Sequence, residues 1–430
     1  MQKTELYTDE QFNNFIEFRQ SVFENGFLAE RNAQQELVDA LLSGRRVRSF
    51  AELTLSSFHR RGWGSSYKAL TRGRQSKKAL QTLYTHQLPN EGLIILVLDG
   101  TKWPHEEAKT LSDLTLERHD HRIRPAHLYS KLCWIPSSEE SWALPLSTVR
   151  AKPDETEGEV GVRQLAEIQP DLPQKAKVMV IVDGRYGNAP FLLGMVEIDM
   201  PFVARLAKNR VFYHPPGPYC GMGRPRVRGE RFDFKDASTW GLPSEMSGFW
   251  HHKHGFVWLK RWDNLYDKQV TDVPITLVRA EIHLEDEDRP EPLWLMYWGP
   301  GASARMIWEW YGQRFPVEPA IRFSKQRLYW TLPRVQKTER CDRWTNLVDV
   351  AYWNIWLARD LVQDNPLPWQ KSQKKRKPER ILEGSGQLLA TLPFLTSTVK
   401  PRGKSPGWPR GQPRIPPVRF PLEKRAKNKA

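Results

Sequence analysis

The sequence predicts an α/β fold in which helices flank a mixed β-sheet. Two apolar runs, residues 93–98 and 178–182, have the length and composition of buried central strands, and Asp-Gly follows each of them. Between the two runs, residues 129–135 and 141–149 alternate in polarity across a Pro-Ser-Ser turn, as the strands of a hairpin do. Residues 159–168 then have the pattern of a helix that leads into the second run. This order predicts one sheet with both parallel and antiparallel neighbours.

The chain is long and rich in tryptophan. Its 430 residues exceed the size at which a single hydrophobic core usually stops growing, so we expect a central domain with appended segments. Apolar residues make up 39% of the sequence, which is enough to build that core, and 18 residues are Trp. Most indoles are expected inside the core. Because indole rings also stack on bases, their abundance permits a nucleic-acid partner without establishing one.

Changes in pattern divide the chain into five segments. In chain order these are a helical domain (1–88), the first part of the α/β core (89–209), a β-rich insertion (210–290), the second part of the core (291–365) and a basic, Pro-rich tail (366–430). The helical domain carries ten Lys and Arg residues between positions 45 and 78, enough to follow a phosphate backbone. A solvated helix face would show the same pattern, so DNA binding by this domain is one of two interpretations.

The positive charge of the protein is concentrated in the tail. The whole chain has a formal net charge of +15, and residues 371–430 contain sixteen Lys and Arg against three Glu. That segment therefore carries +13 and leaves +2 for the rest of the chain. A solubilising disordered tail is one interpretation. Binding of a polyanion fits better, because the same segment contains Trp408 and many prolines.

Cysteine spacing and hydropathy constrain the compartment. Cys133, Cys220 and Cys341 lie far apart without C-x-x-C spacing, so neither a disulfide framework nor a zinc knuckle is indicated. The first twenty residues are polar and acidic, and no run of eighteen uncharged apolar residues occurs. We expect a soluble, intracellular protein that has no membrane partner.

Two carboxylates follow the two apolar strands. Taken singly, Asp99 and Asp183 are ordinary residues for a turn or a helix N-cap. Together they end two parallel strands of one sheet, which places both at the sheet edge where α/β proteins gather ligands. Carboxylates in such a position can share hard cations.

A second polar group lies further along the chain. At about 100° per residue, its four members fall within roughly 60° of one helix face, and an ordinary amphipathic helix is the alternative interpretation. This face would offer a phenol, a guanidinium that can grip phosphate, a carboxylate and an ammonium, from Tyr311, Arg314, Glu318 and Lys325. Because Pro316 and Pro319 bracket the glutamate, the helix is expected to start afresh there and to offset the first two residues from the last two.

These motifs together resemble a known family. Asp99-Gly-Thr, Asp183-Gly-Arg-Tyr and Tyr311-x2-Arg314-x3-Glu318-x6-Lys325, in this order, are similar to bacterial insertion-sequence transposases with a DDE triad and the Y-R-E-K signature. The resemblance covers about residues 93–330. It implies a ribonuclease-H-like core, a mixed five-stranded sheet flanked by helices, with a β-rich insertion before the helix that bears the glutamate.

The resemblance also implies a reaction and its cofactor. Asp99, Asp183 and Glu318 would be catalytic and would hold two Mg²⁺ (or Mn²⁺) ions about 4 Å apart for in-line attack on DNA phosphorus. The partners would be double-stranded DNA, namely the element's terminal inverted repeats and a target, bound by a homodimer on paired ends. The location would be the cytoplasm of a bacterium, in association with the nucleoid.

Further residues are expected to contact the DNA. By the same resemblance, phosphates near the scissile bond would be gripped by Tyr311, Arg314 and Lys325, with Arg185 and Tyr186 nearby. Trp294 is the candidate for stacking on a flipped base, against the alternative of a core tryptophan, and Trp298 competes for the same role.

Two other functions remain open at this point. A structure-selective nuclease would use the same site without ever joining strands. A domesticated, inactive DNA-binding protein descended from a transposase would keep the fold without turnover, although the intact triad argues against it.

Overall fold

The computed structural model describes residues 9–119, 122–137, 140–219, 221, 224–252, 254–283, 292–364, 366, 368–370, 377–399, 407, 410–413 and 416–425. Trp408 and Cys220 lie outside these described residues. Among the helices that are described, none is long and apolar enough to cross a membrane.

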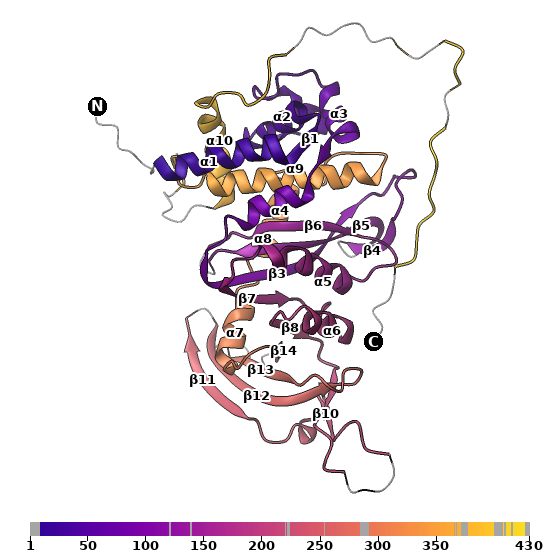
Figure 1. Ribbon diagram of the computed structural model, residues 1–430, viewed down its shortest axis with the longest axis vertical. Coiled ribbons are helices and arrows are strands. Elements are labelled where there is room, and N and C mark those ends of the chain that lie inside the picture. The colour runs from indigo at the N-terminus through magenta and orange to yellow at the C-terminus, as the bar shows by residue number, and fades with distance from the viewer. Residues whose placement is uncertain are drawn as a thin grey trace.

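A large mixed sheet forms the centre of the molecule (Figure 1). Its central strand β3 (Glu91–Pro104) pairs in parallel with β7 (Lys175–Val182) and antiparallel with β5 (Arg122–Ile135). On the outer sides, β6 (Leu144–Ala151) pairs with β5, and β8 (Phe202–Leu206) runs parallel to β7. The two predicted apolar strands and the predicted hairpin are confirmed, and this order is consistent with a ribonuclease-H-like fold.

Strand β3 extends further than the apolar run predicts. Its pairing with β7 stops at Leu98 opposite Val182, but its pairing with β5 continues to Pro104 opposite Ala126. Asp99 therefore lies inside a strand and not at its end. The reason is that β5 supplies backbone partners for six residues beyond the point where β7 turns away.

The insertion continues the same sheet. Within the described residues the sheet has twelve strands, so the predicted set of five is only part of it. Beyond β8 comes β14 (Leu293–Trp298), which pairs antiparallel with it, and then β13 (Ile275–His283) and β12 (Gly255–Asp267). Four further strands complete the sheet: β4 (Thr115–His119), β9 (Val211–Tyr213), β10 (Arg231–Asp233) and β11 (Glu245–His251). The open edge of β8 explains this arrangement, because its backbone groups need partners.

Helices cover the sheet. α5 (Glu157–Ile168) packs on β5 and β6 and against α6 (Ala189–Glu197). α7 (Ala304–Gly312) packs on strands on both sides of β8, and α8 (Val317–Gln326) packs on β3. The long α9 (Thr338–Leu357) lies on β6 and joins the sheet to the N-terminal helices, as Figure 1 shows.

Residues 9–85 form a mainly helical unit, most of it on the other side of α9, with its last helix against β6. Its helices are α1 (Asp9–Ser21), α2 (Arg31–Leu42), α3 (Gly64–Arg72) and α4 (Lys77–Thr85), with short strands β1 (Phe27–Ala29) and β2 (Arg74–Gln75). Helices α1, α2 and α3 pack on α9. The expected helical character of this region is therefore present.

The basic tail contains a packed helix that the sequence pattern did not predict. α10 (Pro378–Ala390) lies against α9 and α2, with Ile381 and Leu382 buried. Further on, the backbone N–H of Phe420 donates to the carbonyl of Lys109, and that of Glu423 donates to Leu114. The high Lys, Arg and Pro content hides the apolar face of a single three-turn helix.

Candidate active site

The register of β3 and β7 brings the two aspartates together. Leu98 is opposite Val182, so Asp99 and Asp183 each follow the last residue of the paired segment. Asp183 lies in the turn after β7, where its Oδ1 accepts the backbone N–H of Gly184 at 2.5 Å. Asp99 points from β3 into a more enclosed position, with 13% of its side chain exposed against 30% for Asp183.

Glu318, on α8, lies near the two aspartates, and the prolines beside it explain why a new helix begins there. α7 ends at Gly312 and α8 begins at Val317 with Pro316 as its N-cap, so the expected helix break is present. Glu318 therefore lies in the first turn of a new helix, where the helix dipole favours a carboxylate. Its side chain is 56% exposed and faces the two aspartates across one arginine.

That arginine is Arg314, in the connection between the two helices. Its Nη2 donates to Oδ2 of Asp99 at 3.2 Å and lies 3.9 Å from Oδ2 of Asp183. Its Nη1 donates to Oε1 of Glu318 at 3.2 Å. One guanidinium thus contacts three carboxylates that are far apart in the sequence.

The charges at this site do not balance. Burial by itself would lower the pKa of Arg314, but the carboxylates of Asp99 and Asp183 outweigh that effect and raise it. One guanidinium neutralises one of three carboxylates, so the group keeps an excess of negative charge. Carboxylate oxygens are the ligands of hard divalent cations, and such cations would compensate the remaining charge.

Asp99 experiences this imbalance most strongly. Its pKa is raised to about 6, chiefly by burial. The charges of Asp183 and Glu318 contribute to this rise, and that of Arg314 opposes it. The metal-free protein therefore holds Asp99 in an environment that disfavours its charged form.

This shift predicts how stability depends on pH without metal. The folded-state pKa lies above the unfolded value, so the favourable contribution is complete below pH 3.8 and is lost as the pH rises through about 6. Asp99→Asn stays neutral and escapes that loss. We expect the variant to exceed wild type in free energy of unfolding at pH 8 by up to about 3 kcal/mol, and by about half of that at pH 5. Urea unfolding in EDTA measures this, and an equal difference at both pH values would contradict it.

A fourth carboxylate, which the sequence pattern did not single out, borders the site. Glu157, the first residue of α5, accepts a hydrogen bond from Nη1 of Arg185 at 2.9 Å through its Oε1. A Cβ on Gly100 would lie 2.9 Å from its Oε2, so this oxygen touches the strand beside Asp99. Within the described structure, that Oε2 is buried without a hydrogen-bond partner. No sequence signal separates Glu157 from the other acidic residues at this helix start.

The expected DNA contacts fall into two groups, and the first lies at or near the carboxylates. Arg185 is bound to Glu157 but keeps 48% of its side chain exposed. Tyr311 is mostly buried on α7, and burial raises its pKa. Lys325 follows Glu318 along α8, with its Nζ 5.9 Å from the ring centre of Trp330.

The second group is in the core, which corrects two expectations. Tyr186 is fully buried, and its ring meets Phe191 edge-on, so it offers DNA no surface. Trp294 is 2% exposed and stacks on Phe234 at 4.0 Å between ring centres. The four central residues of β14 are all buried, so Trp294 is enclosed along with its neighbours on both faces of the strand. Trp298, at the end of β14, is partly exposed.

Fold and site together define an α/β protein with an acidic centre where two parallel strands of a mixed sheet diverge. Residues 22–254 match the family described as DDE superfamily endonuclease. The match covers more than half of the chain, so the chain belongs to this family. Its members cleave DNA and generally use divalent metal ions. No curated protein matches the chain. The matched residues include Asp99 and Asp183 but end before Glu318, whose place in the site therefore depends on geometry.

Proposed function

We propose that this endonuclease is a transposase of the Y-R-E-K type, which cleaves and joins DNA at the terminal inverted repeats of a bacterial insertion sequence. The observation that carries the proposal is the convergence of Asp99, Asp183 and Glu318 on the guanidinium of Arg314. A ribonuclease-H-like nuclease needs three such carboxylates at one edge of its sheet.

The residues fit a pair of Mg²⁺ or Mn²⁺ ions. Three carboxylates with one arginine leave uncompensated negative charge, and the buried Oε2 of Glu157 adds an oxygen without a partner among the described residues. Asp99, Asp183 and Glu318 would hold the ions. When bound, two such ions activate a water or a DNA 3′-hydroxyl and stabilise the leaving oxygen of in-line attack at phosphorus.

The protein's own part is to position the DNA. Arg185 presents a half-exposed guanidinium beside Asp183, where it can grip a phosphate oxygen. Lys325 lies two turns after Glu318 on the same helix and can contact the neighbouring phosphate. Arg314 would leave the carboxylates when the ions bind and would then face the scissile phosphate. Tyr311, mostly buried on α7, lies close enough to Arg314 for the guanidinium charge to oppose the rise of its pKa.

One experiment separates transposition from simple cleavage. Purified full-length protein is incubated with DNA carrying the element's ends and a supercoiled target, in the presence of Mg²⁺. We expect nicks at the element ends followed by products in which those ends are joined to target DNA. Cleavage without joined products would indicate a structure-selective nuclease, and binding without cleavage would indicate an inactive, domesticated protein. Two copies of the chain on paired ends are expected in the active complex.

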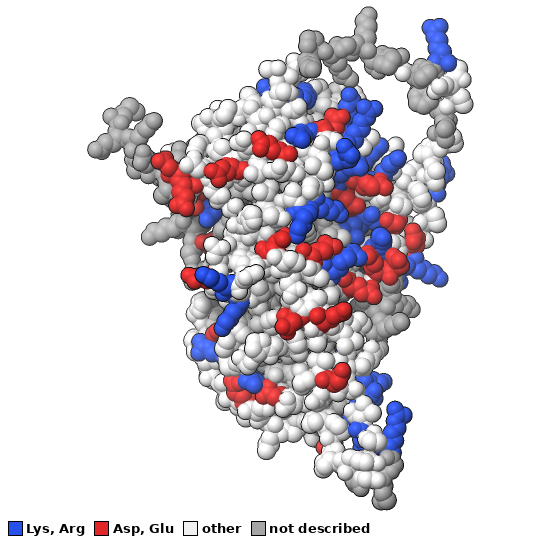
Figure 2. All heavy atoms as spheres, in the orientation of Figure 1, with Lys and Arg blue, Asp and Glu red and all other residues white. Residues whose placement is uncertain are grey.

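The basic tail is expected to strengthen DNA binding. Figure 2 shows Lys and Arg gathering along one side of the molecule, over α3 and the β4–β5 edge, interspersed with acidic residues. Because α10 is packed, an informative truncation must lie beyond it, for example after Val399. This removes ten Lys and Arg and one Glu.

The slope of log affinity against log salt should fall by about 0.9 for each phosphate that the protein no longer neutralises. We expect the slope of the truncated protein to be smaller by at least about two, measured by fluorescence anisotropy at several salt concentrations. A protein that ends at Arg425 keeps eight of the ten basic residues and is the matched control. An unchanged slope after truncation at Val399 would assign the tail a role other than DNA binding.

A further inference from the structure

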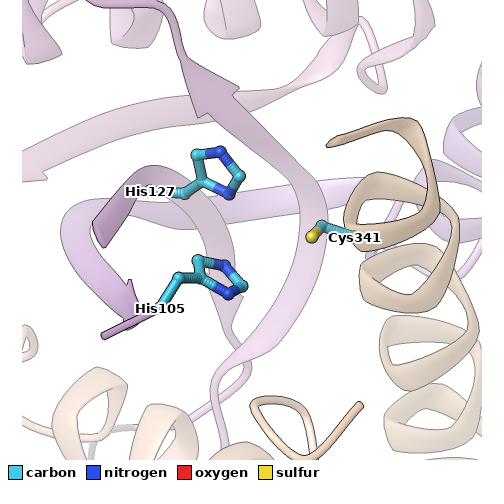
Figure 3. A group of neighbouring side chains, drawn as sticks. All are labelled: His105, His127 and Cys341. Atoms are coloured by element: carbon cyan, nitrogen blue, oxygen red, sulfur yellow. The ribbon is translucent and has the colours of Figure 1, made fainter. Parts of the chain in front are cut away.

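A second group of metal-ligating side chains lies away from the carboxylates. His105 follows the last residue of β3, His127 is on β5 opposite Trp103, and Cys341 is in the first turn of α9. One ligand atom from each of these residues lies within 4.8 Å of the others. In Figure 3 the two imidazole rings lie one above the other and face the sulfur of Cys341.

The hydrogen bonding leaves two ring nitrogens without a partner. Nε2 of His127 lies 2.9 Å from the carbonyl oxygen of Ser112, so this nitrogen carries the proton and donates it. Its Nδ1 then has a free lone pair, and the residue is 0% exposed. Within the described residues, neither Nδ1 of His127 nor Nε2 of His105 has a hydrogen-bond partner. A buried acceptor without a partner is unfavourable, and a bound cation would remove that cost.

The hydrogen bond from His127 to the carbonyl of Ser112 is of the kind that metal-bound histidines usually make. A ligating imidazole generally donates its other N–H to a carbonyl or carboxylate, which fixes the tautomer and the ring orientation. Burial lowers the pKa of His127 to about 4 and that of His105 to about 3, so both rings are neutral and their lone pairs are available.

We propose that His105, His127 and Cys341 bind a Zn²⁺ ion through Nε2, Nδ1 and Sγ respectively. Two imidazoles and a thiolate suit this borderline-soft cation, whereas Mg²⁺ requires oxygen ligands. The Cys341 thiol loses its proton to solvent as the sulfur–zinc bond forms. Zinc–ligand bonds of about 2.0–2.3 Å require the three atoms to approach one another slightly, by side-chain rotation.

A cavity supplies the fourth position. His105 lines a cavity of about 970 Å³ that also borders Arg334 and Arg419. A water molecule from this cavity can complete a tetrahedral site. Because His127 and Cys341 are fully buried, His105 is the ligand through which the ion enters.

The ion would link the two halves of the catalytic centre. β3 carries Asp99 a few residues before His105, and α9 follows the helix that carries Glu318. Zinc at this position would therefore connect β3, which carries Asp99, to α9, which follows the helix that carries Glu318. We expect the zinc ion to have a structural role. Beyond its pairing with β7, β3 begins with Asp99 at the catalytic site and ends at Pro104, next to the zinc ligand His105.

Metal analysis and cobalt substitution test the proposal. Full-length protein purified without chelator should contain about one zinc ion per chain by mass spectrometry. Replacement by Co²⁺ should produce a thiolate-to-cobalt charge-transfer band in the near ultraviolet. Cys341→Ser should lose this band. The matched control is Cys133→Ser, which alters the other described free, buried cysteine and should keep the band.

Each outcome decides the matter. Wild-type protein without stoichiometric zinc, or with cobalt bound but no thiolate band, overturns the proposal. A band that survives in Cys341→Ser also overturns it. If Cys341→Ser does not fold, the wild-type spectrum still decides, and His105→Gln at the cavity rim replaces it as the variant. With Mg²⁺ present throughout to fill the carboxylate site, a failure of Zn²⁺ to raise the melting temperature of the chelated wild-type protein would equally contradict the site.

Discussion

Asp99→Asn should reduce metal-dependent DNA cleavage on the order of 10³-fold or more. The change removes one anionic ligand from a group of three carboxylates but keeps the size of the side chain. The hydroxide or 3′-hydroxyl that attacks phosphorus is activated only where the ions are held, so the loss should appear in the chemical step. Asp183→Asn and Glu318→Gln should have effects of similar size.

A nicking assay under single-turnover conditions measures this loss, and filter binding tests whether the variants still bind DNA. Glu309→Gln is the matched control, because Glu309 is an exposed carboxylate on α7 that pairs with Arg305 away from the site. We expect it to cleave at the wild-type rate. If any one of the three variants cleaves at that rate, its residue does not belong to the triad.

Arg314→Met should destabilise the metal-free protein by about 2–4 kcal/mol. Arg314 is buried and contacts all three carboxylates, so its loss leaves three like charges close together, with the neighbouring Arg185 already paired to Glu157. Mg²⁺ should restore much of the stability, because the ions provide the charge that the guanidinium supplied. The stabilisation by Mg²⁺ should therefore be larger in the variant than in wild type.

Thermal unfolding with EDTA and with Mg²⁺ gives the two stabilisation energies. Arg305→Met, on the neighbouring helix α7, is the matched control, since Arg305 pairs with exposed Glu309 at i,i+4, and it should cost less than about 1 kcal/mol. A variant of Arg314 that Mg²⁺ stabilises no more than wild type would show that the arginine and the cations do not share this position.

Much of the sheet could be predicted because local patterns dictate it. Continuous apolar runs predict buried central strands, and those at 93–98 and 178–182 are inside β3 and β7. Proline geometry predicted the new helix start near Glu318 for the same reason, since backbone restriction is a local property. The spacing of Tyr311, Arg314 and Lys325 was informative only in combination with the two aspartates.

Other features depend on contacts that no local pattern encodes. The insertion joins the main sheet because its strand β13 pairs with β14, which in turn pairs with the open edge of β8. Tyr186 and Trp294 are buried although both belong to candidate motifs, since neighbouring elements cover them. Glu157 borders Asp99 only because α5 packs on β5.

The sequence by itself determined the strands, the acidic residues that follow them and the break before Glu318. These depend on polarity and backbone geometry over a few neighbouring residues. Only the tertiary structure decided that Arg314 lies among three carboxylates, and that His105, His127 and Cys341 meet. Such groups form when strand register and helix packing join segments hundreds of residues apart, and the composition of each segment carries no record of its partner.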